Sequence, residues 1–234
     1  MRINPSSALG RLLAAWCALA AASSSGFGAI ITVPTDLNSG DQYRLVFVTS
    51  ATRDAASTDI SEYNQFVETI ADATPDLQAL GTDWYAIGAT DTVDARDNTA
   101  TNPTIEVGVP IYSVNGVRLA DDYADLWDGF LAAAYTTDEN GNEVSGLAWT
   151  GMHSNGVART GGALGEAVGR IHVGELGNEA QSGGWSGDGA SRPDNTEQNH
   201  LYGMSALLTV APEPSGALLS LVAIAAIGLR RRRS

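Results

Sequence analysis

The stretch "YRLVFVT", Tyr43–Thr49, is dense in aromatic and β-branched residues. Such residues are enriched in strands because they pack well on a pleated, half-buried surface. The stretch has no glycine, proline or acidic residue to interrupt it. It therefore predicts a buried strand early in the chain.

Two helices are predicted after this strand. Asp59 can cap the first helix, and Glu62 follows three residues later, as in a capping box. One face of this helix carries four apolar residues at helical spacing: Ile60, Tyr63, Val67 and Ile70. The second helix is short, with Thr74 as its cap, Pro75 in its first position and Gly81 just after its end.

The pattern then changes to short strands and long loops. Asn115-Gly116 lies between two β-rich runs of Val109–Ala120, which predicts a hairpin. A helical turn is expected in "ADDYADLWDGFL", with Tyr123, Leu126 and Trp127 packed inward. Further strands are expected at Asp83–Ala89, Leu147–Thr150 and His200–Val210, and surface loops over Gly161–Asn199. Two early helices followed by many short strands describe an α+β domain.

The order of short motifs along this body is informative as well. It runs "LVFVTSATRDA", "WYAIGATDTVDARDN", "GVPIYSVNGVRLADDYADLWDG", "AWTGMHSNG" and "LYGMSALLTV". In this order the motifs resemble the C-type-lectin-like fold, in the variant of the collagen endostatin domain and related bacterial exported domains. The resemblance covers roughly residues 43–210. The calcium-site tripeptides of sugar-binding members, the zinc-binding histidines of endostatin and the family's disulfides have no counterpart here, so lectin activity does not follow from the fold.

The C-terminal residues 211–234 have an organisation of their own. Pro212-Glu213-Pro214 is followed by an apolar run over 216–229 and then by Arg230, Arg231, Arg232 and Arg233. As a helix the apolar run is about 21 Å long, shorter than a hydrocarbon core of about 30 Å. The order resembles the PEP-CTERM sorting signal of bacteria. That resemblance implies a transmembrane helix held transiently in the inner membrane and an exosortase-type enzyme that processes the chain. An ordinary single-span anchor is the alternative.

The N-terminus predicts export independently. Arg2 and Arg11 precede an apolar stretch, Leu12–Ala22, and small residues follow, which is typical of a signal peptide. We therefore expect a signal peptide over 1–29, a single C-type-lectin-like α+β domain over 30–210 and the sorting signal over 211–234. The expected location is the inner membrane for the precursor, and then the cell surface or extracellular matrix.

The charge of the predicted mature body excludes one class of partner. Residues 30–214 contain 7 arginines, no lysine and 27 acidic residues, a formal net charge of −20. Such a surface repels nucleic acid, and it attracts divalent cations. The body also has no cysteine, so that packing rather than disulfides must hold it together.

The sequence predicts no catalytic residue and no confident metal site. His153, His172 and His200 lack metal-ligand spacing, and loop or surface positions explain them better. "DENGNE" at Asp138–Glu143 starts like a calcium loop, but a hairpin tip at Asn140-Gly141 explains it more simply. Arg96 is expected to bridge to a carboxylate in a structural role. The candidate ligand-binding residues, with calcium as the possible ion of the acidic loop, are Asp188, Asp194, Asn195, Glu197, Trp127 and His153.

Three functions stay open from the sequence. The leading one is a non-enzymatic exported protein of the cell envelope or exopolysaccharide matrix, acting as a binding or structural module. The second is a calcium-dependent glycan-binding lectin. The third is a secreted hydrolase with an unrecognised pair of carboxylates, which would face each other across a cleft about 5–10 Å wide.

Overall fold

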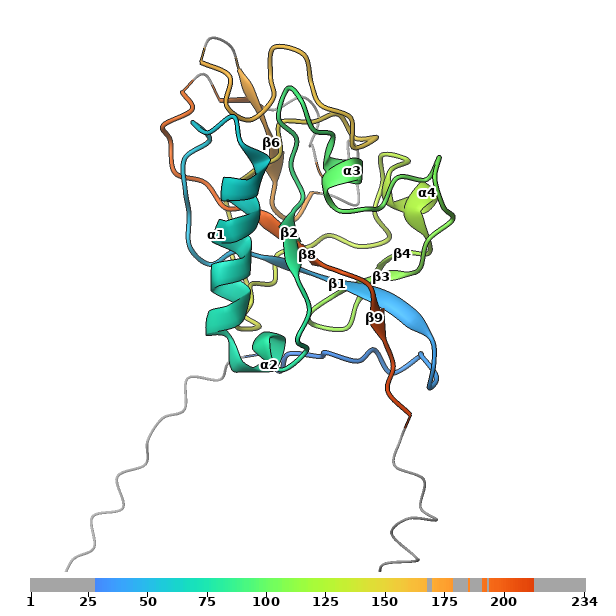
Figure 1. Cartoon of the computed structure of the whole chain (residues 1–234). Coiled ribbons are helices and arrows are strands. Elements are labelled where there is room, and N and C mark those ends of the chain that lie inside the picture. The colour runs from blue at the N-terminus through green and yellow to red at the C-terminus, as the bar shows by residue number, and fades with distance from the viewer. Residues whose placement is uncertain (1–27, 168–169, 179–184, 186–190, 193, 213–234) are drawn as a thin grey trace, which may run out of the picture.

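The structure is a computed structural model that describes residues 28–167, 170–178, 185, 191–192 and 194–212 (Figure 1). Residues 1–27 of the predicted signal peptide, residues 213–234 of the predicted sorting signal, and Asp188 lie outside the described residues. Within the described ranges, no helix has the length and apolar character to cross a membrane. The described chain is a mixture of helix and sheet, which confirms the α+β class.

The predicted early strand is the central strand of the main sheet. It is β1, Gln42–Val48, and it pairs parallel with β3, Ile111–Ser113. On its other side it pairs antiparallel with β8, Tyr202–Ser205. Three further strands complete the sheet: β2 (Trp84–Ala86) beside β8, β4 (Arg118–Ala120) beside β3, and β9 (Leu208–Thr209) against the start of β1. The first and last strands of the body are therefore neighbours.

β1 is buried on both of its faces. Val46 and Val48 join one hydrophobic cluster, which contains Trp127 and Trp185. Leu45 and Phe47 join a second cluster with Tyr63, Trp84 and Trp149, among other residues. A strand covered on both faces needs a continuous apolar run rather than an alternating one, which is what "LVFV" supplies.

Helix α1, Ile60–Ala73, packs along the side of this sheet with Tyr63, Val67 and Ala71 buried (Figure 1). Asp59 caps it as predicted, since its Oδ1 accepts the N–H of Ser61 at 2.9 Å. The capping box does not form as predicted. The N–H of Asp59 donates to Ser57 Oγ instead, and the Glu62 carboxylate lies 3.9 Å from Arg53.

The other helices are single turns. α2, Pro75–Gln78, begins at the predicted proline, although the Thr74 hydroxyl donates back to Ile70 rather than capping it. α3 spans Ala95–Asn98. α4, Tyr123–Leu126, is the predicted helical turn, and Tyr123, Leu126 and Trp127 are all buried as expected.

The predicted hairpin connects β3 to β4. Gly116 takes a left-handed φ of +84°, and its N–H donates to the carbonyl of Ser113. Asn115 has no positive φ, so the loop is a type I turn followed by a left-handed glycine rather than a two-residue primed turn.

A second sheet corrects the prediction of loops over Gly161–Asn199. β6, Ile171–Glu175, lies within that stretch and pairs antiparallel with β5, Leu147–Trp149. β7, Ser191–Arg192, extends the sheet on the other side of β6. The polar and glycine-rich residues on either side predict loops, and the strand between them has only five residues, of which the first four are buried.

Gly203 on β8 allows α1 to approach the sheet. A Cβ atom at this position would lie 2.5 Å from Val67 Cγ1 and 2.9 Å from two ring carbons of Phe47. We predict that Gly203→Ala lowers the free energy of unfolding by about 1–3 kcal/mol, as overpacking of a filled core does. Chemical denaturation measures this. Because Val67→Ala removes the nearest atom, the double variant should lose less than the sum of the single losses. Strict additivity would contradict the assigned contact.

Candidate functional site

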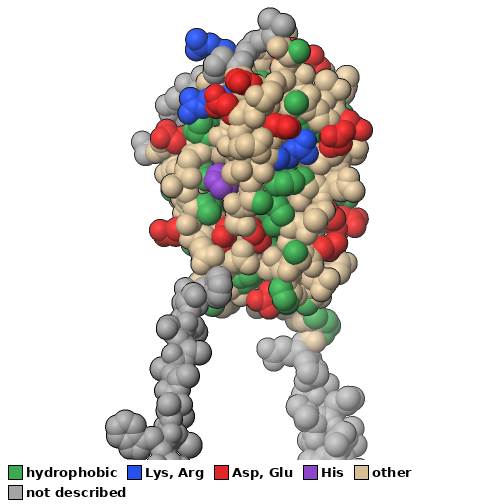
Figure 2. Space-filling view, turned by 90° about the vertical axis from the view of Figure 1, so that its left-hand side faces the viewer, with side chains coloured by type: hydrophobic (Ala, Val, Ile, Leu, Met, Phe, Trp, Pro, Cys, Tyr) green, Lys and Arg blue, Asp and Glu red, His purple; other side chains and the backbone are tan. Residues whose placement is uncertain are grey.

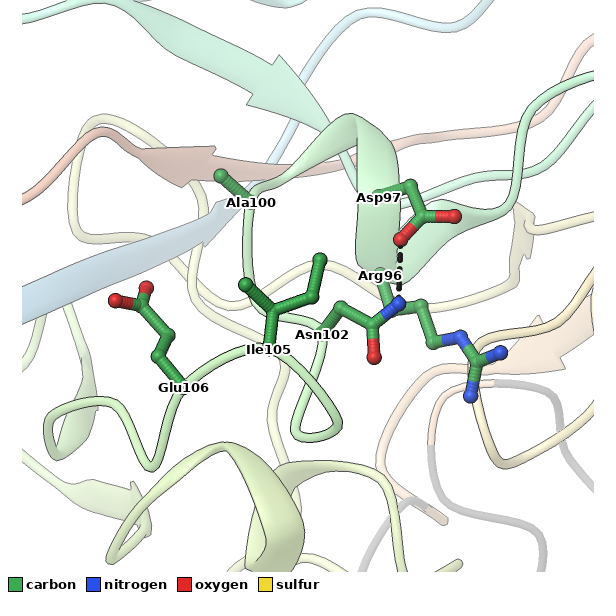
Figure 3. A pocket seen from close by; sticks show the side chains of 6 residues that line it. All are labelled: Arg96, Asp97, Ala100, Asn102, Ile105 and Glu106. Atoms are coloured by element: carbon green, nitrogen blue, oxygen red, sulfur yellow. Dashed lines mark hydrogen bonds between the residues drawn. The ribbon is translucent and has the colours of Figure 1, made fainter.

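A surface pocket lies between α3 and the loop that follows it (Figure 3). Its volume is about 470 Å³. Six residues line it: Arg96, Asp97, Ala100, Asn102, Ile105 and Glu106. We call it the α3 pocket. It combines one cation, two carboxylates and an amide with an aliphatic wall.

Hydrogen bonds within one short segment shape the pocket. Asn102 donates its Nδ2 to Asp97 Oδ1 at 2.6 Å (Figure 3). Its Oδ1 accepts from the N–H and the hydroxyl of Thr104. The Asn102 side chain therefore ties the end of α3 to the loop that carries Ile105 and Glu106.

The backbone of the pocket is strained at Ala100. This residue has a φ of +51°, the only positive φ of a non-glycine residue in the described chain. The left-handed region costs such a residue about 1–2 kcal/mol. The strain persists because the Ala100 carbonyl accepts a hydrogen bond from Arg44 Nη2 at 3.2 Å.

Arg44 is a buried cation beside this pocket, with an exposed fraction of 5%. Its Nε donates to the Tyr123 hydroxyl at 2.8 Å and its Nη1 to the Ser205 carbonyl at 2.9 Å. Among the described residues it forms no ion pair with a carboxylate. A guanidinium held only by neutral oxygens keeps a positive potential close to the pocket.

The rim of the pocket offers both polar and apolar contacts. Asp97 and Glu106 lie on opposite sides of it, with Ile105 between them (Figure 3). Ile105 and Val107 are 78% and 76% exposed. Arg96 Nη2 lies 3.6 Å from Asp94 Oδ2, which confirms the predicted bridge, while Arg96 Nε is buried and has no hydrogen-bond partner in the described part of the chain. The arrangement suits a ligand that has an apolar face and several hydrogen-bonding groups.

A second hollow lies on the outer face of α1, with a volume of about 530 Å³. Its lining residues are Arg53, Glu62, Gln65, Phe66, Thr69 and Ile70. Figure 2 shows hydrophobic side chains in the middle of this side of the molecule, with acidic groups around them. The Arg53 guanidinium stands 4.1 Å from the centre of the Tyr63 ring, a cation–π contact that anchors α1.

The three described candidates of the acidic loop, Asp194, Asn195 and Glu197, each contact a different group of the chain. Asp194 Oδ1 accepts from the N–H and hydroxyl of Thr196. Glu197 lies 3.5 Å from Arg192, and Asn195 donates to the carbonyl of Glu166. Over the ranges that the structure describes, no group of three or more His, Cys, Asp or Glu side chains could hold a metal ion.

The other sequence candidates lie in different surroundings. Trp127 is a core residue, as its predicted inward packing requires, and its Nε1 donates to Thr101 at 3.0 Å. His153 is exposed in a tight turn, where its carbonyl accepts from the N–H of Gly156. The Asp138–Glu143 stretch forms the predicted hairpin tip, with the Asp138 carboxylate accepting from the N–H groups of Asn140 and Asn142.

The sequence does not predict the α3 pocket. Of its lining residues the sequence indicates only Arg96, and for a structural role. The pocket depends on the positive φ of Ala100 and on hydrogen bonds between residues five apart or more. A glycine at position 100 would indicate a left-handed backbone conformation, but an alanine does not.

His172 is a buried histidine that makes stability depend on pH. Burial, which has the largest effect, and the nearby charges of Arg159 and His153 together lower its pKa to about 4. In the unfolded chain the His172 imidazole is protonated near pH 6.5, whereas in the folded chain it is protonated only near pH 4. Stability from this group is complete above pH 6.5 and is lost as the pH falls towards 4.

We predict that the free energy of unfolding decreases by about 1–3 kcal/mol between pH 7 and pH 4.5 through His172. Denaturation curves at several pH values measure the decrease. His172→Gln should remove this component, whereas His153→Gln, at an exposed histidine, should leave most of it. An unchanged pH dependence in His172→Gln would contradict the assignment.

No protein-family model and no curated protein matches this chain. The α3 pocket must therefore be judged by its own geometry. That geometry provides an aliphatic wall, an amide, a cation and two carboxylates around one hollow.

Proposed function

We propose that this protein is a non-enzymatic exported protein of the cell surface or extracellular matrix, sorted by a C-terminal signal of the PEP-CTERM type. Its body has a C-type-lectin-like fold and acts as a binding or structural module. The observation that carries the proposal is the order of the C-terminal residues: a Pro-Glu-Pro triplet at 212–214, an apolar run over 216–229 and four arginines over 230–233.

The position of the last described residues supports processing at the triplet. The chain leaves the sheet after β9, and Ala211 and Pro212 are exposed and belong to no helix or strand. An enzyme that acts on the chain near Pro212 therefore meets accessible backbone.

The arrangement of the body supports a binding role. The two ends of the described chain, coloured blue and red, lie at its lower end in Figure 1, whereas α3 lies in the upper half. A chain tethered beyond Pro212 would then hold the α3 pocket away from the membrane.

The motifs that resemble the C-type-lectin-like fold come together in space, which supports that part of the proposal. β1, β3 and β8 are adjacent in one sheet. β5, from the "AWTGMHSNG" motif, adjoins the start of the last motif, since the N–H of Trp149 donates to the carbonyl of His200.

The sorting proposal predicts a precursor that accumulates when the triplet is altered. Glu213→Gln should leave uncleaved chain in the inner membrane, because the processing enzyme reads the triplet. Fractionation and immunoblotting of the host cells measure this. Glu143→Gln, at an exposed glutamate of the body, is the matched control and should be processed normally. Normal release of Glu213→Gln would contradict the proposal.

A hydrolase is a second candidate, because Asp97 and Glu106 line one pocket from opposite sides. Paired carboxylates are the usual machinery of glycoside hydrolysis. If the α3 pocket hydrolyses glycosides, the purified protein should turn over one member of a chromogenic glycoside panel. Asp97→Asn and Glu106→Gln should each abolish that turnover, and Glu143→Gln should retain it. Glycan binding on an array, with or without calcium, and without turnover supports the binding module instead.

A further inference from the structure

Basic side chains gather where the hairpin around Met152–Ala158 meets β6. Met152 and Ala158 face each other in this hairpin, and Met152 is buried in the core. Successive side chains of an extended chain point to opposite faces. His153 and Arg159 therefore lie on the face of the hairpin opposite to Met152.

The start of β6 adjoins the same face. The carbonyl of His172 accepts the N–H groups of Thr150 and Gly151, and the N–H of Arg159 donates to the carbonyl of Gly151. Arg170 is exposed and directly precedes β6, and the N–H of His172 donates to the carbonyl of Gly162 beside it.

Gly162 brings these groups close together. A Cβ atom at this position would lie 3.1 Å from His172 Cδ2 and 3.2 Å from Arg159 Cδ, and 3.0 Å from the Arg170 carbonyl oxygen. The side chains of Arg159 and His172 thus flank one glycine. The nearby charges of Arg159 and His153 also lower the pKa of His172, as their proximity requires.

The arginines of this face differ from the other arginines of the body. Arg53, Arg96, Arg118 and Arg192 each lie within ion-pair distance of a carboxylate. Arg44 is buried and is held by neutral oxygens. Arg159 and Arg170 form no ion pair with any carboxylate that the structure describes, although acidic residues outnumber arginines in this body by 27 to 7.

His172 adds an unused polar group. Its side chain is buried, with an exposed fraction of 4%, and its Nδ1 has no hydrogen-bond partner among the described residues. A buried polar nitrogen without a partner is costly, and such groups often mark the place of a water or a ligand.

We propose that Arg159, Arg170, His153 and His172 form an anion-binding site for the carboxylate or sulfate groups of an acidic polysaccharide. Guanidinium groups bind carboxylate and sulfate oxygens through paired, charge-assisted hydrogen bonds. The site lies apart from the α3 pocket and does not depend on it. The choice of a polymer as the ligand rests on the proposed extracellular role, while the anion chemistry rests on the contacts above.

Asp94 contacts this hairpin, but its carboxylate is engaged by other groups. Its Oδ1 accepts the N–H of Ala158 at 2.8 Å, and its Oδ2 faces Arg96 at 3.6 Å. The Asp94 carboxylate is therefore already engaged on the side of the hairpin that carries Ala158.

Binding of polymers with known charge tests the proposal. The full chain, purified in a non-ionic detergent, is titrated by calorimetry with oligogalacturonate, dextran sulfate and uncharged dextran at about 0.15 M salt. We expect one or both acidic polymers to bind and uncharged dextran not to bind. Arg159→Gln combined with Arg170→Gln should weaken binding at least about tenfold, since both substitutions remove charge-assisted hydrogen bonds to the anion. Arg118→Gln, at an exposed arginine on β4, is the matched control and should bind like the unaltered chain.

Each outcome supports or overturns the proposal. Oligogalacturonate alone or dextran sulfate alone identifies the carboxylate or the sulfate as the anion. Equal weakening in Arg118→Gln shows unspecific attraction and overturns the site, as does the absence of binding to both polymers. Thermal unfolding of each variant excludes loss of fold as the cause. Failure of the sorting experiment would leave the anion result unchanged, so that the two proposals fail separately.

Discussion

The guanidinium of Arg44 is the interaction on which the arrangement of this molecule depends. It stands on the central strand and is buried, so its charge must be met by oxygens from elsewhere in the chain. The oxygens come from Tyr123 in α4, Ser205 in β8 and Ala100 after α3. These residues lie 56 to 161 positions from Arg44 in the sequence. One side chain therefore fixes three remote segments relative to β1.

The same interaction explains why a strained backbone lies beside the pocket. The left-handed conformation of Ala100 costs about 1–2 kcal/mol. Without a donor to its carbonyl, this conformation would not be stabilised. A hydrogen bond to a charged group contributes about 1.5–3 kcal/mol, which is enough to offset that cost. The α3 pocket thus owes its shape to a buried charge, and the body has no disulfide that could hold the loop instead.

The sequence predicted the elements whose signals are local. The sequence predicts β1 because burial on both faces requires an uninterrupted apolar run. It predicts α1 because Asp59 and the apolar face lie within a few residues of each other. β6 was missed because five residues between glycine-rich stretches give too short a pattern. Arg44 in "YRLVFVT" could not be recognised as a buried cation, since its partners are distant in the chain. The α3 pocket depends on Arg44, so that local sequence patterns do not predict the pocket either.

The distribution of charge connects the two proposed sites with the acidic surface. A body of net charge −20 repels acidic polymers at long range, but at about 0.15 M salt the Debye length is about 8 Å. The attraction or repulsion that a bound anion feels therefore comes mainly from charges within about one Debye length of it. Four arginines already face carboxylates, so they offer little attraction to an incoming anion. An acidic polymer can therefore be held only where arginines have been left without such partners. In an acidic protein, two arginines on one face decide where an anion binds, and the surrounding acids exclude it from the rest of the surface.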